Sequence, residues 1–528
     1  MKRTLALLFT FLLPVLVQAQ IEFGERYEQK HTWQNESYLV VSNEEEGLLL
    51  LETDFDAASK DYPVYLKQFD TELNVGWQDT LRIPQRFFIK GYHYSEKKTF
   101  LLLQNRILSS IKVLRIDAAK GQVDEFESKK IVELDITEFE VVKNTAVIGG
   151  YFEERPAVFA YDLENDIVRT LQNVYQNRSE LLEIKVNRDS VTFNVLASTL
   201  TDNGDRTIVV NTYDYGGTAV RDYRLDIRPE YQLINGISSS INDITQVVVG
   251  LYSVRATNSV AGIYVNYIDR TGQQSMTYHN LGTLPHFFDY MGEKRSKKLK
   301  DKALDFIAEG KEQRYRAEVL FREVLEKDGK LIITAEYHKQ LNNTPSTTRL
   351  MNYNRYNSVN NLYSLYNSYS QFYDGNVMVR ETEFTHAYIM VLDMNGNLEW
   401  DDAMEIDETI EGGLDELGRF QWLGDDKAAY FYYRDEELYM KLLTPKAEAE
   451  VSESELKLMD EVDKIRHEQD ATIGTVRWYD NHFIVYGVQH VRPEDKSEGL
   501  RKVFFINKIS ANENIEPQKL EKSRKHRR

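Results

Sequence analysis

The residues best able to carry chemistry are ten histidines and many carboxylates, because the 528-residue chain contains no cysteine. The missing thiols exclude disulfides, thiolate catalysis, Cys-ligated zinc, iron–sulfur clusters and the cysteine of a lipoprotein anchor. His279 and His286 lie seven residues apart, and His482 and His490 flank one strand-like run. Neither spacing brings two ring nitrogens onto one metal ion by local geometry. We therefore predict no metal site.

Sequence motifs of known enzyme classes are also absent. No HExxH, GxSxG, GxGxxG or Walker-type sequence occurs, and we predict no cofactor. The segment Asp393–Asn397 begins like a calcium loop, but the later acidic ligand does not follow, so a hairpin turn accounts for it. With 84 Asp and Glu residues, a carboxylate pair at the mouth of a central channel could perform glycosidase-type acid–base catalysis. The sequence selects no such pair, and we assign no catalytic residue.

The elements that must position any site are short strands that recur with a period near fifty residues. Apolar runs that end in aspartate and a turn appear repeatedly. The aspartates are Asp70, Asp117, Asp162, Asp214, Asp269 and Asp393. The first five are 45 to 55 residues apart, which is the period of a four-stranded propeller blade. Because one blade cannot bury both of its faces alone, blades stack around an axis. We predict an all-β fold, a β-propeller.

The repeats divide the chain into eight units. They are 36–83, 86–132, 136–173, 178–228, 231–281, 316–406, 417–446 and 472–518. Eight four-stranded blades are expected, with seven as the alternative because the seventh unit is short. Tandem β-sandwiches are the rival architecture, but they would place breaks between units. The recurring Asp is interpreted as a turn residue rather than a calcium ligand. Small residues such as Gly149 and Gly150 are interpreted as a fit to strands crowded at the axis.

Three insertions interrupt the repeat, at 289–316, 341–380 and 446–470. The first predicts a helix whose apolar face holds Leu299, Ala303, Phe306 and Ile307. Lysines cover its other face, which is either a site for an acidic partner or polyanion, or a solvated surface. The third insertion is acidic, and Ser452 and Glu455 resemble a capping box, so it is also predicted to be a helix.

The second insertion holds the predicted binding residues. Segment 352–376 is rich in tyrosine, asparagine and serine, a composition typical of recognition surfaces and suited to stacking on sugars. The candidates are Tyr353, Tyr356, Tyr363, Tyr366, Tyr369 and Tyr373. Their spacing would place most of them on one helical face. An ordered loop whose rings cover the propeller edge, or a disordered segment, are the alternatives.

The N-terminal residues predict export. Residues 1–19 combine a basic start, the apolar run Leu5–Val17 and small residues at Val17 and Ala19, as in a cleaved signal peptide. A single propeller domain, 20–520, and a basic disordered tail, 521–528, are expected to follow. A formal net charge of −19 argues against nucleic-acid and anionic-membrane partners. No later segment reaches the length of a membrane-spanning helix. We expect a periplasmic or cell-surface protein.

Two segments carry a family resemblance. They are Arg316–Tyr337 (RAEVLFREVLEKDGKLIITAEY) and His386–Ile406 (HAYIMVLDMNGNLEWDDAMEI). Together with the Lys-rich helix before them and the Tyr/Asn-rich segment between them, they resemble uncharacterised secreted propeller-like proteins of Bacteroidota. The resemblance covers about residues 290–406. It implies a Gram-negative periplasmic or extracellular setting, and it implies no activity or functional residue.

Three functions are compatible with these features. The first is an exported, non-enzymatic propeller that binds a protein or a glycan through its rim insertions and one propeller face. The second is a propeller hydrolase or lyase acting on polysaccharide, with carboxylates at the axis mouth. The third is a structural component of a cell-surface assembly. Buried carboxylates converging at the axis with aromatic rings or a metal would favour the second function over the first.

Overall fold

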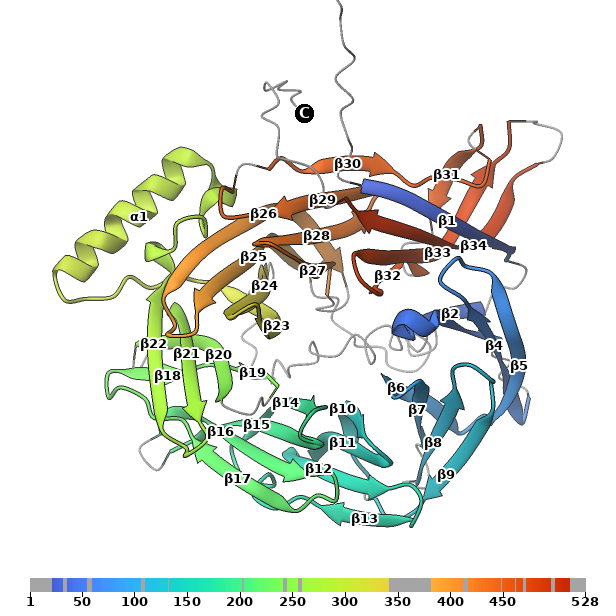
Figure 1. The fold of residues 1–528 in the computed structure, drawn as a ribbon, viewed down its shortest axis with the longest axis horizontal. Coiled ribbons are helices and arrows are strands. Elements are labelled where there is room, and N and C mark those ends of the chain that lie inside the picture. The colour runs from blue at the N-terminus through green and yellow to red at the C-terminus, as the bar shows by residue number, and fades with distance from the viewer. Residues whose placement is uncertain are drawn as a thin grey trace, which may run out of the picture.

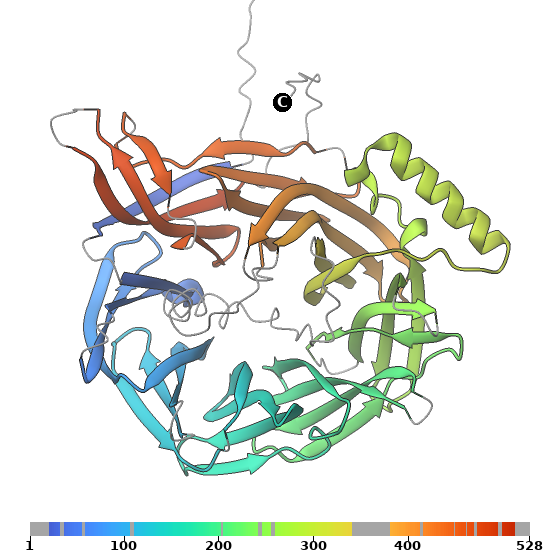
Figure 2. The ribbon, with the colours of Figure 1, turned by 180° about the vertical axis from the view of Figure 1, so that it is seen from behind.

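Eight antiparallel sheets surround one axis in the computed structural model, and together they form a β-propeller (Figure 1). The structure describes residues 21–31, 36–54, 59–105, 110–131, 133–201, 204–240, 245–254, 259–340, 381–411, 416–447, 449–460, 462–468, 472–494 and 499–512. The predicted fold is confirmed, and the number of blades is eight rather than seven. The same closed ring is seen from behind in Figure 2.

Blades 1 to 4 each consist of four consecutive strands, ordered from the axis to the rim (Figure 1). Blade 1 contains Glu36–Ser42 (β2), Leu48–Asp54 (β3), Asp61–Phe69 (β4) and Val75–Pro84 (β5). Blade 2 contains Phe87–Ser95 (β6), Lys98–Asn105 (β7), Ser110–Asp117 (β8) and Val123–Ser128 (β9). Blade 3 contains Asp135–Val142 (β10), Thr145–Phe152 (β11), Arg155–Asp162 (β12) and Ile167–Thr170 (β13). Blade 4 contains Glu180–Asn187 (β14), Thr192–Leu200 (β15), Arg206–Asp214 (β16) and Ala219–Arg224 (β17).

Blades 5 to 7 follow the same plan, except that two short strands share the inner position of blade 5. Blade 5 contains Tyr231–Leu233 (β18), Ile237–Ser238 (β19), Thr245–Val254 (β20), Val260–Asp269 (β21) and Gln274–Asn280 (β22). Blade 6 contains Glu318–Lys327 (β23), Lys330–Gln340 (β24), Glu381–Asp393 (β25) and Leu398–Glu411 (β26). Blade 7 contains Gly418–Gly424 (β27), Lys427–Arg434 (β28), Glu437–Leu443 (β29) and Ser452–Glu455 (β30).

Blade 8 joins the two ends of the described chain. It contains Lys464–Glu468 (β31), Gly474–Arg477 (β32), His482–Arg492 (β33), Arg501–Ala511 (β34) and Ile21–Lys30 (β1). Both β31 and β32 pair with β33, and β1 pairs with β34 as the outermost strand. The short 3-10 helices are Glu44–Glu46 (η1), Leu281–Thr283 (η2) and Asp289–Met291 (η3). The ring is therefore closed by backbone hydrogen bonds between the first and last strands.

The core lies between the blades, and the second strands show why. In β7, Phe100 and Leu102 pack toward blade 3, whereas Leu101 and Leu103 pack toward blade 1. Successive side chains of a strand point to opposite faces. Because both faces of each blade are covered by a neighbour, these strands are continuous apolar runs rather than alternating ones. Among the described residues, one apolar cluster occupies each of the eight blade–blade interfaces.

The recurring aspartates close the turn after the third strand, as predicted. In blade 6 the Asp393 carboxylate accepts hydrogen bonds from the backbone N–H groups of Asn395 and Asn397, both at 2.8 Å. Asp70 and Asp269 accept equivalent backbone bonds in blades 1 and 5. The described residues contain no group of three or more His, Asp or Glu that could hold a metal ion.

The small residues expected at the axis lie one strand further out, so that part of the prediction was wrong. Gly149 and Gly150 belong to β11, the second strand of blade 3. A Cβ atom on Gly149 would lie 2.6 Å from the side chain of Ile184 in blade 4. One on Gly150 would lie 2.1 Å from the carbonyl oxygen of Asp135 in β10. The missing side chains make room for the innermost strand and the next blade.

The third insertion contains strands, and its prediction as a helix was wrong. Ser452–Glu455 forms β30, which pairs with Glu437–Met440 of β29 and completes blade 7. A single capped turn is a marginal helix in isolation, whereas the open edge of β29 offers backbone partners. The seventh unit looked short because its fourth strand lies in this segment.

The first insertion contains the helix α1, Glu293–Ala308, which projects from the ring (Figure 1). Ala303 is buried, but Ile307, expected on the same face, is 42% exposed. The apolar face is therefore narrower than predicted, because the helix packs on the short η2–η3 segment rather than on a whole blade.

No helix in the described part of the chain is long and apolar enough to cross a membrane. The predicted signal peptide 1–19, the six candidate tyrosines of segment 341–380 and the tail 521–528 lie outside the described residues.

Candidate functional site

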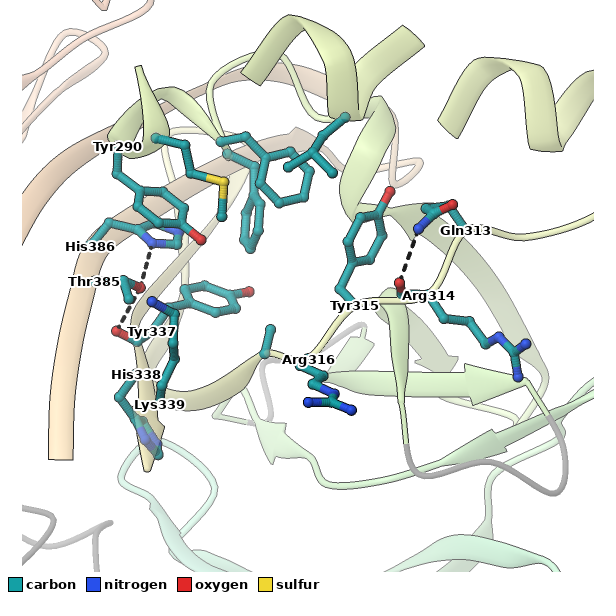
Figure 3. A pocket seen from close by; sticks show the side chains of 15 residues that line it. Tyr290, Gln313, Arg314, Tyr315, Arg316, Tyr337, His338, Lys339, Thr385 and His386 are labelled. Atoms are coloured by element: carbon teal, nitrogen blue, oxygen red, sulfur yellow. Dashed lines mark hydrogen bonds between the residues drawn. The ribbon is translucent and has the colours of Figure 1, made fainter. Parts of the chain in front are cut away.

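A cavity of about 230 Å³ lies between the 281–317 segment and blade 6 (Figure 3). One wall comes from the segment around α1. It consists of Phe287, Phe288, Tyr290, Met291 and Leu299. A second wall is the return loop Gln313–Ala317, and the third is formed by Tyr337, His338, Lys339, Thr385 and His386 at the paired ends of β24 and β25.

The return loop is fixed to blade 5 by one carboxylate. Glu312 accepts hydrogen bonds from the hydroxyl of Tyr252 at 2.8 Å and from the side-chain amide of Asn280 at 3.1 Å. The hydroxyl of Tyr231 also donates to it. The backbone N–H of Tyr315 donates to the carbonyl of Val260 at 2.7 Å. The return loop, which forms one wall of the cavity, is therefore held in place by hydrogen bonds to blade 5.

The aromatic wall is fixed to blade 6 through Asp401, which is buried on β26. Its carboxylate accepts the backbone N–H of His286 at 2.9 Å and the hydroxyl of Tyr388 at 2.9 Å. The ring Nδ1 of His286 lies 3.0 Å from the same carboxylate, and this hydrogen bond raises the pKa of His286. The next residue, Phe287, is thereby held edge-on against Tyr337, with ring centroids 4.7 Å apart.

Three rings form a parallel stack at the base of the cavity. The imidazole of His386 lies between Tyr290 and Tyr337, with centroid distances of 4.3 Å and 4.8 Å. The interplanar angles are 13° and 3°. The stack joins the insertion to two neighbouring strands of blade 6, since Tyr337 is on β24 and His386 is on β25. It gives the cavity a rigid, largely apolar base.

Two polar atoms of this base have no hydrogen-bond partner among the described residues: the hydroxyl of Tyr337 and Nε2 of His386. Both side chains are 1% exposed. In Figure 3 the hydroxyl of Tyr337 points into the open space of the cavity. Leaving a buried polar group unsatisfied costs about 1–3 kcal/mol. Such groups beside a cavity are the feature that marks this place as a candidate binding site.

Burial also fixes the protonation of these two groups. Burial, together with the nearby cation of Lys339, lowers the pKa of His386 to about 3. Burial raises the pKa of the Tyr337 phenol. At neutral pH the imidazole is therefore uncharged and the phenol keeps its proton, so neither group is poised to exchange a proton with a substrate.

Two carboxylates converge between blades 6 and 7, together with Tyr430: Glu336 is buried and Glu416 is partly buried. Glu336 accepts the backbone N–H of Gly418 at 2.8 Å and the hydroxyl of Tyr430 at 2.7 Å, and it also pairs with Arg322. Glu416 lies 2.8 Å from the guanidinium of Arg419. Each carboxylate is thus held by an arginine. The network joins blades 6 and 7.

The histidines singled out in the sequence lie apart from one another and hold no common ligand position. His279 contacts the carbonyl of Gly396 at 3.1 Å, and His286 binds Asp401. His482 stacks on Tyr479, and His490 stacks on His467. The candidate tyrosines lie outside the described residues, although the strands that lead into and out of their segment are the two that form the cavity base.

Tyr290, Tyr337 and His386 were not identified from the sequence. A signal was present, because Tyr337 ends one of the two resemblance segments and His386 begins the other. The two segments are therefore adjacent strands that meet at the cavity, which their separation along the chain conceals.

Comparisons with known proteins extend the description of the fold only. No protein-family model matches the chain, and no curated protein is significantly similar to it. Among solved structures, it is similar to the β-propeller domain of the Trilobed protease from Pyrococcus furiosus, with 9% identity and a TM-score of 0.36 over 82% of this chain and 98% of that one. It is also similar to polysaccharide lyase Uly1, with 7% identity and a TM-score of 0.38 over 87% and 94% of the two chains. Similarity at this level concerns strand arrangement alone.

Proposed function

We propose that this protein is an exported β-propeller that binds a ligand without chemically changing it, and that the cavity between β24, β25 and the 281–317 segment holds this ligand. The observation that carries the proposal is the pair of buried, unpartnered polar atoms, Tyr337 Oη and His386 Nε2, beside a cavity with aromatic walls. A ligand that supplies the missing partners recovers the cost of burying them.

The chemistry of the cavity supports binding rather than catalysis. The imidazole of His386 stays neutral at physiological pH and the Tyr337 phenol stays protonated. General acid–base catalysis works best with a pKa near the operating pH, and neither group meets this condition. The walls are anchored by hydrogen bonds of Glu312 and Asp401 that lie behind the lining residues. Such a preformed cavity is typical of a binding site.

The ligand is either a glycan or a protein that inserts one ring. A cavity of about 150 Å³ admits benzene, so 230 Å³ accommodates one substituted six-membered ring. Export and a periplasmic or cell-surface location remain part of the proposal and follow from residues 1–19 and from the family resemblance. N-terminal sequencing of protein purified from the cell envelope tests export, with Gln20 as the expected first residue.

The cavity can be tested by filling it. The substitution Ala317→Trp places an indole in the return loop, and Ala219→Trp on the exposed face of β17 in blade 4 is the matched control. Both variants and the wild type are used in a glycan array and in a pull-down from the native envelope. Loss of a captured ligand in Ala317→Trp alone supports the proposal, provided that thermal unfolding shows a folded protein. Equal capture by both variants would reject the cavity as the binding site.

A further inference from the structure

The hydrogen bonds around Thr385 determine which nitrogen of His386 carries the proton. The hydroxyl of Thr385 donates to the carbonyl oxygen of Tyr337 at 3.1 Å and lies 3.0 Å from Nδ1 of His386. A hydroxyl has one proton to donate. We assign that proton to the carbonyl, so that the Thr385 oxygen accepts from His386 and Nδ1 carries the proton. In a neutral imidazole, Nε2 is then a bare acceptor.

The base of the cavity therefore presents a defined polar pattern. Nε2 of His386 accepts one hydrogen bond, and the hydroxyl of Tyr337 can both donate and accept. The two rings are stacked 4.8 Å apart and both residues line the cavity, so the two groups are close enough for one ring-sized ligand to span them. A matching ligand must bring at least one O–H or N–H donor to His386 and a donor or acceptor to Tyr337.

From this pattern, and resting on the proposed function, we propose that the cavity recognises the hydroxyl groups of a neutral sugar ring. One sugar hydroxyl donates to Nε2 of His386, and a second accepts from the hydroxyl of Tyr337. The apolar face of the sugar packs on the aromatic walls, where Tyr290 and Tyr315 offer ring surfaces. A carboxylate carries acceptors only, so the acid group of a uronate would face the lone pair of Nε2 and is disfavoured at this position.

One feature of the cavity favours an anionic ligand instead. Arg314 and Arg316 line the cavity, are exposed and form a cationic rim that would attract an anion. In Figure 3 both side chains extend away from the space in front of Tyr337. Lys339 is already paired with Glu383 at 2.9 Å. Solvent screens the attraction between the charges of the rim and an anionic ligand, whereas the hydrogen bonds at the base are buried. We therefore expect the base, rather than the rim, to determine the preference for a neutral sugar over a uronate.

The test is ligand-observed NMR and calorimetric titration of the full mature chain with methyl glucoside, methyl galactoside and methyl mannoside, each beside its uronate where one exists. We expect at least one neutral glycoside to bind more tightly than its uronate. Tyr337→Phe keeps its ring and removes one oxygen atom, whereas His386→Phe keeps a stacked ring and removes both ring nitrogens, including the Nδ1 that contacts Thr385. Each should weaken binding by about tenfold. Tyr65→Phe, at an exposed position of β4, should leave the affinity unchanged.

The proposal is overturned if the uronates bind as tightly as the neutral glycosides, if both ring-preserving variants retain wild-type affinity, or if no neutral glycoside binds. The outcome for the proposed function is separate. A ligand of any other class that is captured by the wild type and lost in Ala317→Trp would leave the cavity as a binding site while rejecting a neutral sugar. Tyr337→Phe removes only one oxygen atom, so the test does not depend on whether His386→Phe folds.

Discussion

Ile21, at the start of β1, pairs with Ala511, at the end of β34, across nearly the whole length of the chain. Both residues are buried. The same strand brings Arg26 to within 2.8 Å of the Gln489 side chain and places its guanidinium 4.6 Å from the ring centre of Phe505. β1 is therefore the strand that closes the ring, and its contacts reach into the interior of blade 8.

Deleting Ile21–Lys30 should open the ring and expose the edge of β34. We expect the free energy of unfolding to fall by more than about 4 kcal/mol, a size that is typical only of major structural defects. The fall would be measured as a lowered midpoint of urea unfolding. Adding a synthetic peptide of residues 20–31 should restore part of the stability, because the missing strand is then supplied in trans. A truncated protein as stable as the full chain would contradict the role of β1 in closure.

Glu336 should be essential for the junction of blades 6 and 7. Changing it to Gln leaves the charge of Arg322, whose side chain is 8% exposed, without its closest carboxylate. Removing one partner of a buried pair costs about 3–5 kcal/mol, with Glu416 reducing the effect. Glu323→Gln is the matched control on β23, since its pair with Arg477 is much more exposed than the pair of Glu336 with Arg322 and should be worth less than about 1 kcal/mol. Equal stabilities of the two variants in chemical denaturation would refute this assignment.

Tyr337 and Tyr388 should differ in what their hydroxyl groups contribute to stability, although both are 1% exposed. Tyr388→Phe breaks a hydrogen bond to the Asp401 carboxylate and should cost about 1.5–3 kcal/mol. Tyr337→Phe removes a hydroxyl that has no partner among the described residues, so the free energy of unfolding should be unchanged or higher. Binding residues often lower stability in this way. A clear destabilisation by Tyr337→Phe would show that its hydroxyl serves the fold.

Acidification should destabilise the protein in part through His386. Burial lowers its folded-state pKa to about 3, while the unfolded chain takes up a proton near pH 6.5. Between these values the unfolded state binds the extra proton, so stability falls as pH falls, by about 1.4 kcal/mol per pH unit for one histidine. As the pH is lowered from 7 to 5, the free energy of unfolding of His386→Phe should therefore rise by about 2 kcal/mol relative to that of the wild type. Urea unfolding at the two pH values measures this difference.

Other histidines contribute to the pH dependence of both proteins, and His338 and His286 illustrate the two possible signs. His338 also has its pKa lowered to about 3, by burial and then by the cation of Arg322, and it acts in the same direction. His286 has a raised pKa, so its contribution is present below pH 6.5 and is lost as pH rises through its folded value. Both are common to the two proteins and cancel in the comparison. An unchanged difference in stability between pH 7 and pH 5 would mean that His386 is solvated.

The aspartates that close the turns should stabilise them without a bound metal ion. Asp393→Ala removes the acceptor of two backbone N–H groups and should lower the melting temperature, whereas Asp393→Asn keeps an acceptor oxygen and should lower it less. A chelator such as EDTA should leave the melting temperature of the wild type unchanged. A fall on adding EDTA that calcium reverses would replace the turn interpretation with an ion site.

Local chemistry explains which features could be predicted from the amino-acid order. The repeated Asp works through backbone groups two to four residues away, so each turn is encoded within its own segment, and the period between turns reveals the propeller. The helix α1 follows from its own composition. Ser452–Glu455 shows the limit: its residues suit a helix cap, yet the open edge of β29 makes it a strand, because pairing with a neighbour outweighs a weak local preference.

The sequence by itself therefore determined the repeating blades and their turns, and it limited the number of blades to eight or seven. Only the tertiary structure decided how the ring closes and where a ligand could bind. Pairing Ile21 with Ala511, or stacking Tyr290 and Tyr337 on His386, depends on packing between segments far apart in the chain. No pattern within either segment records its partner. The unpartnered atoms of Tyr337 and His386 become visible only when the polar groups of the fold are compared with their neighbours in space.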